Sequence, residues 1–404
     1  MITQKERDYL RELAKKQQEY ANTPENKARE AAWYAFNDLK SKTPMVTIEE
    51  WTFFQEVARP LVCESDEARH LEGEIVKHLI GREDINDDRV TPDHLNVGLH
   101  SWFSPFNLQP RRENKGQDLA YVFDAHINDL EDDFHKLGKS TWGVNAEGTQ
   151  AQIDLWSDAV GDILPVRKVF GSAYACPTQW LVHLMHMETM LYSLMDYPEL
   201  MHKAMDMVTA DFVEYMREIE AGGHMVATNG SQGVAQGTYA FNTTLTENNL
   251  RGVWGYLDSQ ETVGISADMF KEFFFPYYKR IGDIFGLLNY GCCEAVHEIW
   301  ESCISTMGNV RKVSISPWCD EDYMGEMLRK APVVYHRKPS PNFLGVDKVF
   351  DEAGFSEHIT KTIKAAQGCS LEFSFRDVYS LQGEKGRAHR AYNIVKSLIE
   401  RHYQ

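Results

Sequence analysis

The sequence predicts an α/β fold, a (β/α)8 barrel that carries an N-terminal helical extension. From about residue 91 onward, short runs of β-branched and aromatic residues alternate with longer helical patterns, which is typical of βα repeats and a parallel sheet. The candidate strands come close to the eight of a barrel, and 404 residues suffice for one barrel with an added segment. We therefore divide the chain into a helical extension, residues 1–90, and a barrel domain, residues 91–404.

The N-terminal extension is expected to be helical throughout. It opens with a charged segment, residues 1–20, continues with a second helix over residues 26–39, and ends with an amphipathic stretch between a Ser65 N-cap signature and a stop at Gly81. Such a segment suits a cap over the barrel or a dimer arm, so a homodimer is compatible with the sequence.

The barrel domain contains the candidate strands and one segment that we interpret as a mobile lid. The lid lies between Thr228 and Gly252, where the chain is rich in Gly, Thr and Asn and looks too polar and too broken for core. The predicted strands are His94–Trp102, Val166–Gly171, Met225–Asn229, Gly252–Asp258, Leu287–Cys292, Lys312–Ser316, Val333–His336 and Ser370–Phe375.

Charge and composition exclude several classes of protein. The net charge is -18 and no Lys/Arg-rich run occurs, which argues against a nucleic-acid surface. No apolar run approaches the roughly 18 residues that a membrane span needs, and the charged opening is not a signal peptide. The 7 cysteines form no CxxC pair and suit reduced thiols. We expect a cytoplasmic protein whose partners are small molecules or other proteins.

The most informative motif is NYGCCE, residues 289–294. If the strand continues through it, Tyr290, Cys292 and Glu294 share one face. A distant Cys369 opens another strand-like run, CSLEFSF. Thiols at the ends of different strands of one sheet are typical of a metal or nucleophile site in a barrel. The alternative is a buried cysteine beside a surface acid.

Two further strand ends carry polar or aromatic groups. The run VVYHRKPSPNF places His336 and Lys338 on one face at the end of a strand, where a barrel puts functional groups, although a lone histidine is often structural. The run VSISPWCDED presents Trp318 and Cys319, either as a pocket wall or as a capped loop.

A family resemblance follows from longer motifs. The run HMETMLYSLMDYPELMHKAMDMVTADFVEYMREIEAGG, followed by GYLDSQETVGISADMFKEFFFPYYKRI, resembles the uroporphyrinogen decarboxylase superfamily over roughly residues 160–404. Its zinc-dependent corrinoid methyltransferases carry His-x-Cys on the strand equivalent to NYGCCE and a second Cys near the C-terminus. Cys292 and Cys369 match those cysteines, and Tyr290 stands in place of the histidine. The opening WYAFNDLKSKTPMVTIEEWTF looks like methyltransferases that act on methoxylated aromatic compounds, and the Arg-rich motif of the true decarboxylases is not found.

The resemblance implies a zinc-dependent methyltransferase that demethylates a methoxylated aromatic compound and methylates a Co(I) corrinoid. No Asp-x-His-x-x-Gly motif occurs, so the corrinoid is expected on a separate protein. Two alternatives remain: a methyl-corrinoid:thiol methyltransferase, in which zinc activates a thiol, and a non-catalytic tetrapyrrole-binding barrel.

The implied site is assigned residue by residue. Zinc is expected on Cys292, Cys369 and Glu294, with Glu261 or Cys319 as alternative third ligands, and a Lewis acid or a proton donor would ease departure of the phenoxide. The catalytic residues are expected to be Glu294, His336 and Lys338, and the substrate-binding residues Tyr290, Trp102, Trp318, His100 and Asp258.

Overall fold

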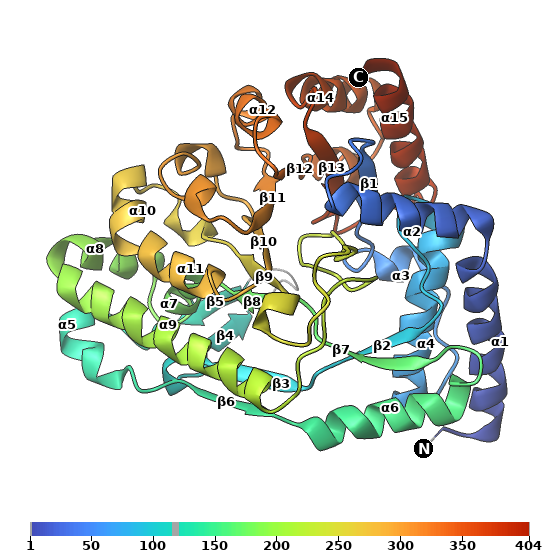
Figure 1. The fold of residues 1–404 in the computed structure, drawn as a ribbon, viewed down its shortest axis with the longest axis horizontal. Helices are drawn as coiled ribbons and strands as arrows, with labels where there is room; N and C mark the ends of the chain where they lie inside the picture. The colour runs from blue at the N-terminus through green and yellow to red at the C-terminus, as the bar shows by residue number, and fades with distance from the viewer. Residues whose placement is uncertain (1, 115–120, 404) are drawn as a thin grey trace.

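The computed structural model, which describes residues 2–114 and 121–403, is built around a parallel sheet (Figure 1). Its seven strands are ordered β1-β13-β12-β11-β10-β9-β8, and every neighbouring pair is parallel. The α/β class and the parallel sheet are thereby confirmed. The strands are β1 (Met45–Ile48), β8 (Ala173–Ala175), β9 (Trp254–Leu257), β10 (Leu287–Tyr290), β11 (Val310–Ile315), β12 (Val334–Arg337) and β13 (Ser370–Phe375).

A second parallel pair extends the arrangement beyond β8. Strand β7 (Val166–Val169) precedes β8 by a few residues and pairs with β2 (Leu95–Gly98). A cavity of about 480 Å³ lies between β2 and β1 and is lined by residues of both strands. Hydrogen bonds between the described strands thus do not close the ring, and the (β/α)8 barrel stays a prediction. No strand forms at 225–229, where one was expected.

The helices alternate with these strands and surround them (Figure 1). Each βα unit needs a crossover between parallel strands, and a helix supplies it. In the described part of the chain, every helix is too short or too polar to span a bilayer. The helices are α1 (Gln4–Ala21), α2 (Pro24–Asn37), α3 (Phe54–Val57), α4 (Asp66–Ile80), α5 (Leu130–Asp133), α6 (Ala146–Val160), α7 (Pro177–Val182), α8 (Met187–Asp196), α9 (Pro198–Ala221), α10 (Ala267–Phe273), α11 (Phe275–Gly282), α12 (Glu321–Arg329), α13 (Asn342–Gly345), α14 (Glu352–Ala365) and α15 (Arg387–His402).

Two short antiparallel strand pairs lie between β2 and α6, where the sequence predicts no strands beyond residue 102. Strand β3 (Ser101–Ser104) pairs with β6 (Thr141–Val144), and β4 (Arg111–Asn114) pairs with β5 (Tyr121–Asp124). The predicted strand at 94–102 therefore divides into β2 and part of β3.

The N-terminal region begins as expected but is not helical throughout. Thr3 and Glu6 form a capping box at the start of α1, and α4 lies between Ser65 and Gly81 as predicted. The expectation of helix over all of residues 1–90 is wrong at β1, which pairs with β13 at the other end of the chain. The division at residue 90 stays a prediction, although the sheet takes strands from both sides of it.

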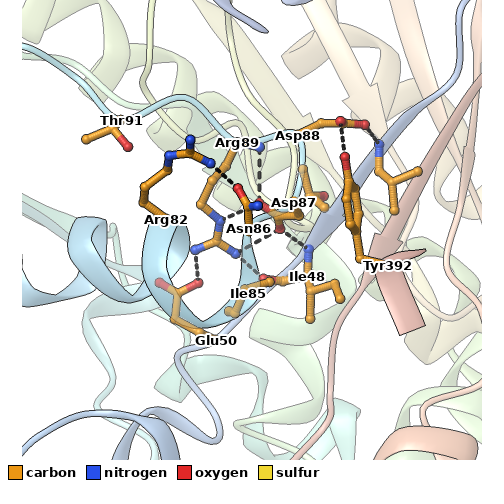
Figure 2. Close-up of polar contacts among 12 residues, drawn as sticks. Ile48, Glu50, Arg82, Ile85, Asn86, Asp87, Asp88, Arg89, Thr91 and Tyr392 are labelled. Carbon is orange, nitrogen blue, oxygen red and sulfur yellow. Dashed lines mark hydrogen bonds and ion pairs between the residues drawn. The ribbon is translucent and has the colours of Figure 1, made fainter. Parts of the chain in front are cut away.

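The outer edge of β1 is closed by side chains rather than by another strand (Figure 2). Asp88 Oδ2 accepts from the Val46 amide at 2.8 Å, and Asp87 Oδ2 accepts from the Ile48 amide at 2.7 Å. Arg89 donates to the Ile48 carbonyl and pairs with Asp87. Because these groups satisfy the backbone of β1, the strand needs no further neighbour.

The segment interpreted as a lid packs against the sheet. Lys312 Nζ donates to Thr238 Oγ1 at 2.6 Å and Thr47 Oγ1 donates to the Gly237 carbonyl at 3.0 Å. Val234 and Ala240 are fully buried in a cluster with Trp254 and Leu287. The view that this segment is too polar for core is therefore wrong, because its apolar residues face the sheet while its backbone bonds polar groups of the strands.

Candidate functional site

A cavity of about 470 Å³ lies at the carboxyl ends of three neighbouring strands. Glu261 follows β9, Cys293 follows β10 and Trp318 follows β11. Carboxyl ends of parallel strands meet at one edge of a sheet, and α/β enzymes bind their ligands there. The cavity is lined by Met187, Gln260, Glu261, Val263, Cys293, Ala295 and Trp318.

Most of the cavity wall is apolar, and Glu261 is its carboxyl group. Trp318 is 75% exposed and Val263 is 60% exposed, so both present open apolar surface. Glu261 is 6% exposed and accepts a hydrogen bond from Thr178 Oγ1 at 2.9 Å. Burial raises the pKa of Glu261. A carboxyl that retains its proton more readily than usual thus faces a cavity of the size that binds small molecules.

Cys293 lines this cavity and has the thiol of Cys292 beside it. Gly291 has a φ of 99°, which turns the chain directly after β10. The Sγ atoms of Cys292 and Cys293 are then 3.7 Å apart, and Cys293 is exposed. A hydrogen bond from Cys292, with help from the charge of Lys338, lowers the pKa of Cys293 to about 7, while the same bond raises that of Cys292.

A buried chain of hydrogen bonds connects Lys338 to Asp258. Lys338 Nζ donates to Gln236 Oε1 at 2.8 Å, Gln236 Nε2 donates to the Tyr256 hydroxyl at 2.5 Å, and that hydroxyl donates to Asp258 Oδ2 at 2.6 Å. Asp258 is 1% exposed and its Oδ1 makes no hydrogen bond. Burial, followed by the charges of Glu294 and Cys292, raises the pKa of Asp258.

Gln236 and Tyr256 are the members of this chain that sequence reasoning missed. The φ of Gln236 is 58°, and Ala235 before it has a φ of 62°. Non-glycine residues seldom adopt this left-handed conformation, and such strain concentrates at functional positions. Nothing in the sequence marks Ala235 and Gln236, because the partners of Gln236, Tyr256 of β9 and Lys338 after β12, are distant in the chain.

Glu294 accepts hydrogen bonds from two loops and is not among the residues that line the cavity. It is 4% exposed, and its two oxygens accept from the amides of Ser259 at 2.9 Å and Cys292 at 2.7 Å. The loop after β9 is thereby fixed to the loop after β10. Both oxygens of the buried Glu294 are thus held by backbone amides, an arrangement that does not fit its catalytic and metal-binding assignments.

The predicted zinc ligands are not brought together. Cys369 precedes β13 at its amino end, is buried, and donates to the Gly325 carbonyl at 3.4 Å. Cys292 follows the carboxyl end of β10, so the two thiols lie at opposite ends of one parallel sheet. Among the described residues, no group of three or more His, Cys, Asp or Glu side chains is arranged to hold a metal. The set of Cys292, Cys369 and Glu294 does not fit zinc.

Tyr290 and His336 are fully buried away from the cavity. Tyr290 bonds Ser259 Oγ at 2.8 Å and packs on Tyr278 of α11, so it cannot stack on a substrate ring. The left-handed turn at Gly291 interrupts the alternation of strand faces, so the predicted shared face of Tyr290 and Cys292 is not formed. His336 Nε2 lies 2.8 Å from Ser374 Oγ, and burial lowers the pKa of His336 to about 4. Both assignments are thereby corrected.

The remaining predicted residues take four different positions. Trp102 lines another cavity, of about 350 Å³, together with Tyr174, whose ring stacks on Tyr256 at 5.2 Å. His100 Nε2 bonds Gln152 Oε1 at 2.7 Å on the surface. Cys319 is buried and contacts the Glu294 carbonyl. Of the predicted residues, Trp318 and the alternative ligand Glu261 line the cavity beside Cys293.

The comparisons with known proteins concern the fold. No family model and no curated protein matches this sequence. A solved structure of a methyltransferase from Methanosarcina mazei superposes with a TM-score of 0.52 and 12% identity, covering 90% of this chain and 98% of that chain. At this identity the similarity shows a shared fold, extending over nearly the whole of both chains.

Proposed function

We propose that this protein is a methyltransferase that takes the methyl group of a methoxylated aromatic compound and passes it to the Co(I) corrinoid of a separate protein. The fold shared with a methyltransferase of Methanosarcina mazei supports the reaction class. The resemblance to the corrinoid-dependent branch of the uroporphyrinogen decarboxylase superfamily supports the donor and acceptor.

The observation that carries the proposal is Glu261 in its apolar cavity. The ring of the donor packs against Trp318 and Val263, which offers an aromatic and an aliphatic wall. Glu261, which accepts a hydrogen bond from Thr178 at 2.9 Å, lines this space. The volume of about 470 Å³ falls in the range of small-molecule sites.

In this arrangement Glu261 acts as the general acid. Co(I) attacks the methyl carbon with an electron pair and the carbon–oxygen bond breaks. The leaving oxygen, whose conjugate acid has a pKa of about 10, takes the proton of Glu261. The products are the phenol and methyl-Co(III), and water returns a proton to the carboxylate. The cavity remains open on the side of Trp318, from which the corrinoid protein approaches.

The test is anaerobic methyl transfer to reduced corrinoid, free or on a carrier protein, with a panel of methoxylated aromatic compounds. The visible spectrum is expected to change from Co(I) to methyl-Co(III) with release of one phenol per transfer. Glu261→Gln should lower the rate constant on the order of 10²–10⁴-fold and leave the apparent donor affinity nearly unchanged.

The matched control is Glu326→Gln. Glu326 is an exposed residue of α12, and its carboxylate pairs with Lys330 just after the helix. This variant should transfer methyl groups at the wild-type rate. Absence of transfer from every donor with a competent carrier present would refute the proposal. Full activity of Glu261→Gln would refute the assignment of the acid.

A further inference from the structure

The cavity that contains Trp102 is rich in aromatic rings. It has a volume of about 350 Å³ and lies at the carboxyl ends of β2 and β7. Half of the described residues that line it are aromatic, and none of them is Asp, Glu, Lys, Arg or His. It shares no lining residue with the cavity of Glu261. The molecule therefore has a second cavity of different chemistry.

Four of these rings pack together as one side of the cavity. The Phe103 ring centroid lies 5.2 Å from that of Trp180, 5.4 Å from that of Phe212 and 5.5 Å from that of Tyr215. The Tyr215 hydroxyl donates to Ser101 Oγ at 2.8 Å, so its polar atom already has a partner. This side of the cavity is thus a fixed group of ring faces and edges.

Two further rings of the lining keep open surface. Trp102 is 53% exposed and Tyr174 is 46% exposed. One face of Tyr174 is covered by Tyr256, since their ring centroids are 5.2 Å apart and their planes differ by 20°. The opposite face of Tyr174 is left for the cavity. Faces of aromatic rings carry negative electrostatic potential, which attracts a cation.

The surroundings of the ring pair also favour a positive ligand. The Tyr256 hydroxyl donates to Asp258 Oδ2 at 2.6 Å, and Asp258 Oδ1 is buried without a hydrogen bond. Asp258 lies near enough for its charge to act on Tyr174. The ammonium group of Lys338 is separated from Tyr256 by Gln236. The net charge of -18 attracts cations to the whole molecule as well.

We propose that this cavity binds the quaternary ammonium group of a small molecule through cation–π contacts with Trp102 and Tyr174. A quaternary ammonium has no N–H, so it needs no hydrogen-bond acceptor from the wall. A volume of about 350 Å³ falls in the range of small-molecule sites. This site stands on the ring geometry and does not rest on the proposed methyl transfer.

The experiment is isothermal titration calorimetry of the full-length protein with choline as the probe. The comparison ligand is the uncharged analogue of choline in which a carbon atom replaces the nitrogen. Both have the same shape, so the difference between them reports the charge. Choline should bind at least about tenfold more tightly than the analogue. Equal affinities, or no binding of choline, would overturn the proposal.

Ring substitutions locate the site. Trp102→Leu and Tyr174→Leu should each weaken choline binding by about tenfold, because each removes one aromatic face. Tyr174→Phe is the matched control, since it keeps the ring and loses only the hydrogen bond to Gln179. It should bind choline nearly as the wild-type protein does, and so should Trp318→Leu, which alters the other cavity.

Unchanged choline binding in both leucine variants would contradict the assignment. Trp102 and Tyr174 are each about half exposed, so both variants are expected to fold, as circular dichroism checks, and either of them alone tests the site.

Vesicles of phosphatidylcholine distinguish a free ligand from a lipid headgroup. The protein should remain in the supernatant when such vesicles are sedimented, and co-sedimentation would overturn the assignment to a small molecule. Neither measurement includes a methyl donor or a corrinoid, so failure of the proposed function leaves both results unaffected.

Discussion

Gly291 decides where the two thiols lie. Its φ of 99° is a left-handed conformation that favours glycine, and an added Cβ would lie 3.2 Å from both Ser314 Cβ and Val296 Cγ1. The turn it makes ends β10 and places Cys293 at the cavity. Strict alternation through Gly291 predicts Tyr290 and Cys292 on one face, and the left-handed turn at this glycine breaks that alternation.

Gly291→Ala is expected to destabilise the protein by about 1–3 kcal/mol, because it combines backbone strain with a close contact. Urea denaturation measures the change in the free energy of unfolding. Gly308→Ala is the control, since no atom lies within 4 Å of its added Cβ and its φ is not positive. Equal stability of the two variants would contradict the argument.

Cys293 is expected to react with iodoacetamide far faster than the other cysteines. Its pKa of about 7, lowered by the Cys292 hydrogen bond and then by Lys338, makes the thiolate available at neutral pH. The alkylation rate should therefore rise with pH to a plateau, with a midpoint near 7. Mass spectrometry of the modified peptides measures it.

Lys338→Met should move that midpoint to higher pH, because the thiolate loses a nearby positive charge. Cys369 serves as the internal reference, since burial raises its pKa to about 11. A midpoint unchanged by Lys338→Met would show that Lys338 does not act on the thiol.

At the scale of secondary-structure elements, the Lys312–Glu372 pair joins β11 to β13 across β12. Both side chains are fully buried and their charged atoms are 2.7 Å apart. The Lys312 ammonium also lies 5.3 Å from the Trp33 ring of α2 and 5.9 Å from the Trp254 ring of β9. The pair therefore connects the sheet to the N-terminal helices.

Lys312→Met is expected to cost about 3–5 kcal/mol, because it leaves the buried Glu372 carboxylate without its partner. The double variant Lys312→Met/Glu372→Gln should recover part of this loss, which denaturant unfolding measures. Lys330→Met removes an exposed ion pair and should leave stability nearly unchanged. A double variant as unstable as Lys312→Met alone would contradict the explanation.

The same pair predicts a dependence on pH. Burial opposes ionisation of Glu372, but Lys312 and then His336 outweigh it and lower the pKa of Glu372. A carboxyl whose folded pKa is lowered stabilises the protein above its unfolded pKa, and this stabilisation is lost as the pH falls through the folded pKa. Acid unfolding should therefore begin at higher pH in Lys312→Met, as followed by circular dichroism.

At the scale of the whole molecule, residues 1–90 are expected to be required for folding of the remainder. Strand β1 pairs with β13, and Trp33 and Phe36 form a buried cluster with Val334 and Phe241. A protein that starts at residue 91 would expose the edge of β13 and this cluster, which favours aggregation. We expect it to be insoluble or to lack a cooperative thermal transition. A soluble fragment that unfolds cooperatively would show that the N-terminal region is separable.

The sequence by itself determined the α/β class, most strands of the sheet and the bounds of α4, because these rest on local periodicity and local signals. The tertiary structure alone decided that β1 joins β13, that segment 228–252 packs on the sheet, and that Gln236 links Lys338 to Tyr256. It also decided that Cys292 meets Cys293 and not Cys369. Contacts between distant residues depend on strand order and on which end of a strand each residue occupies, and sequence spacing fixes neither.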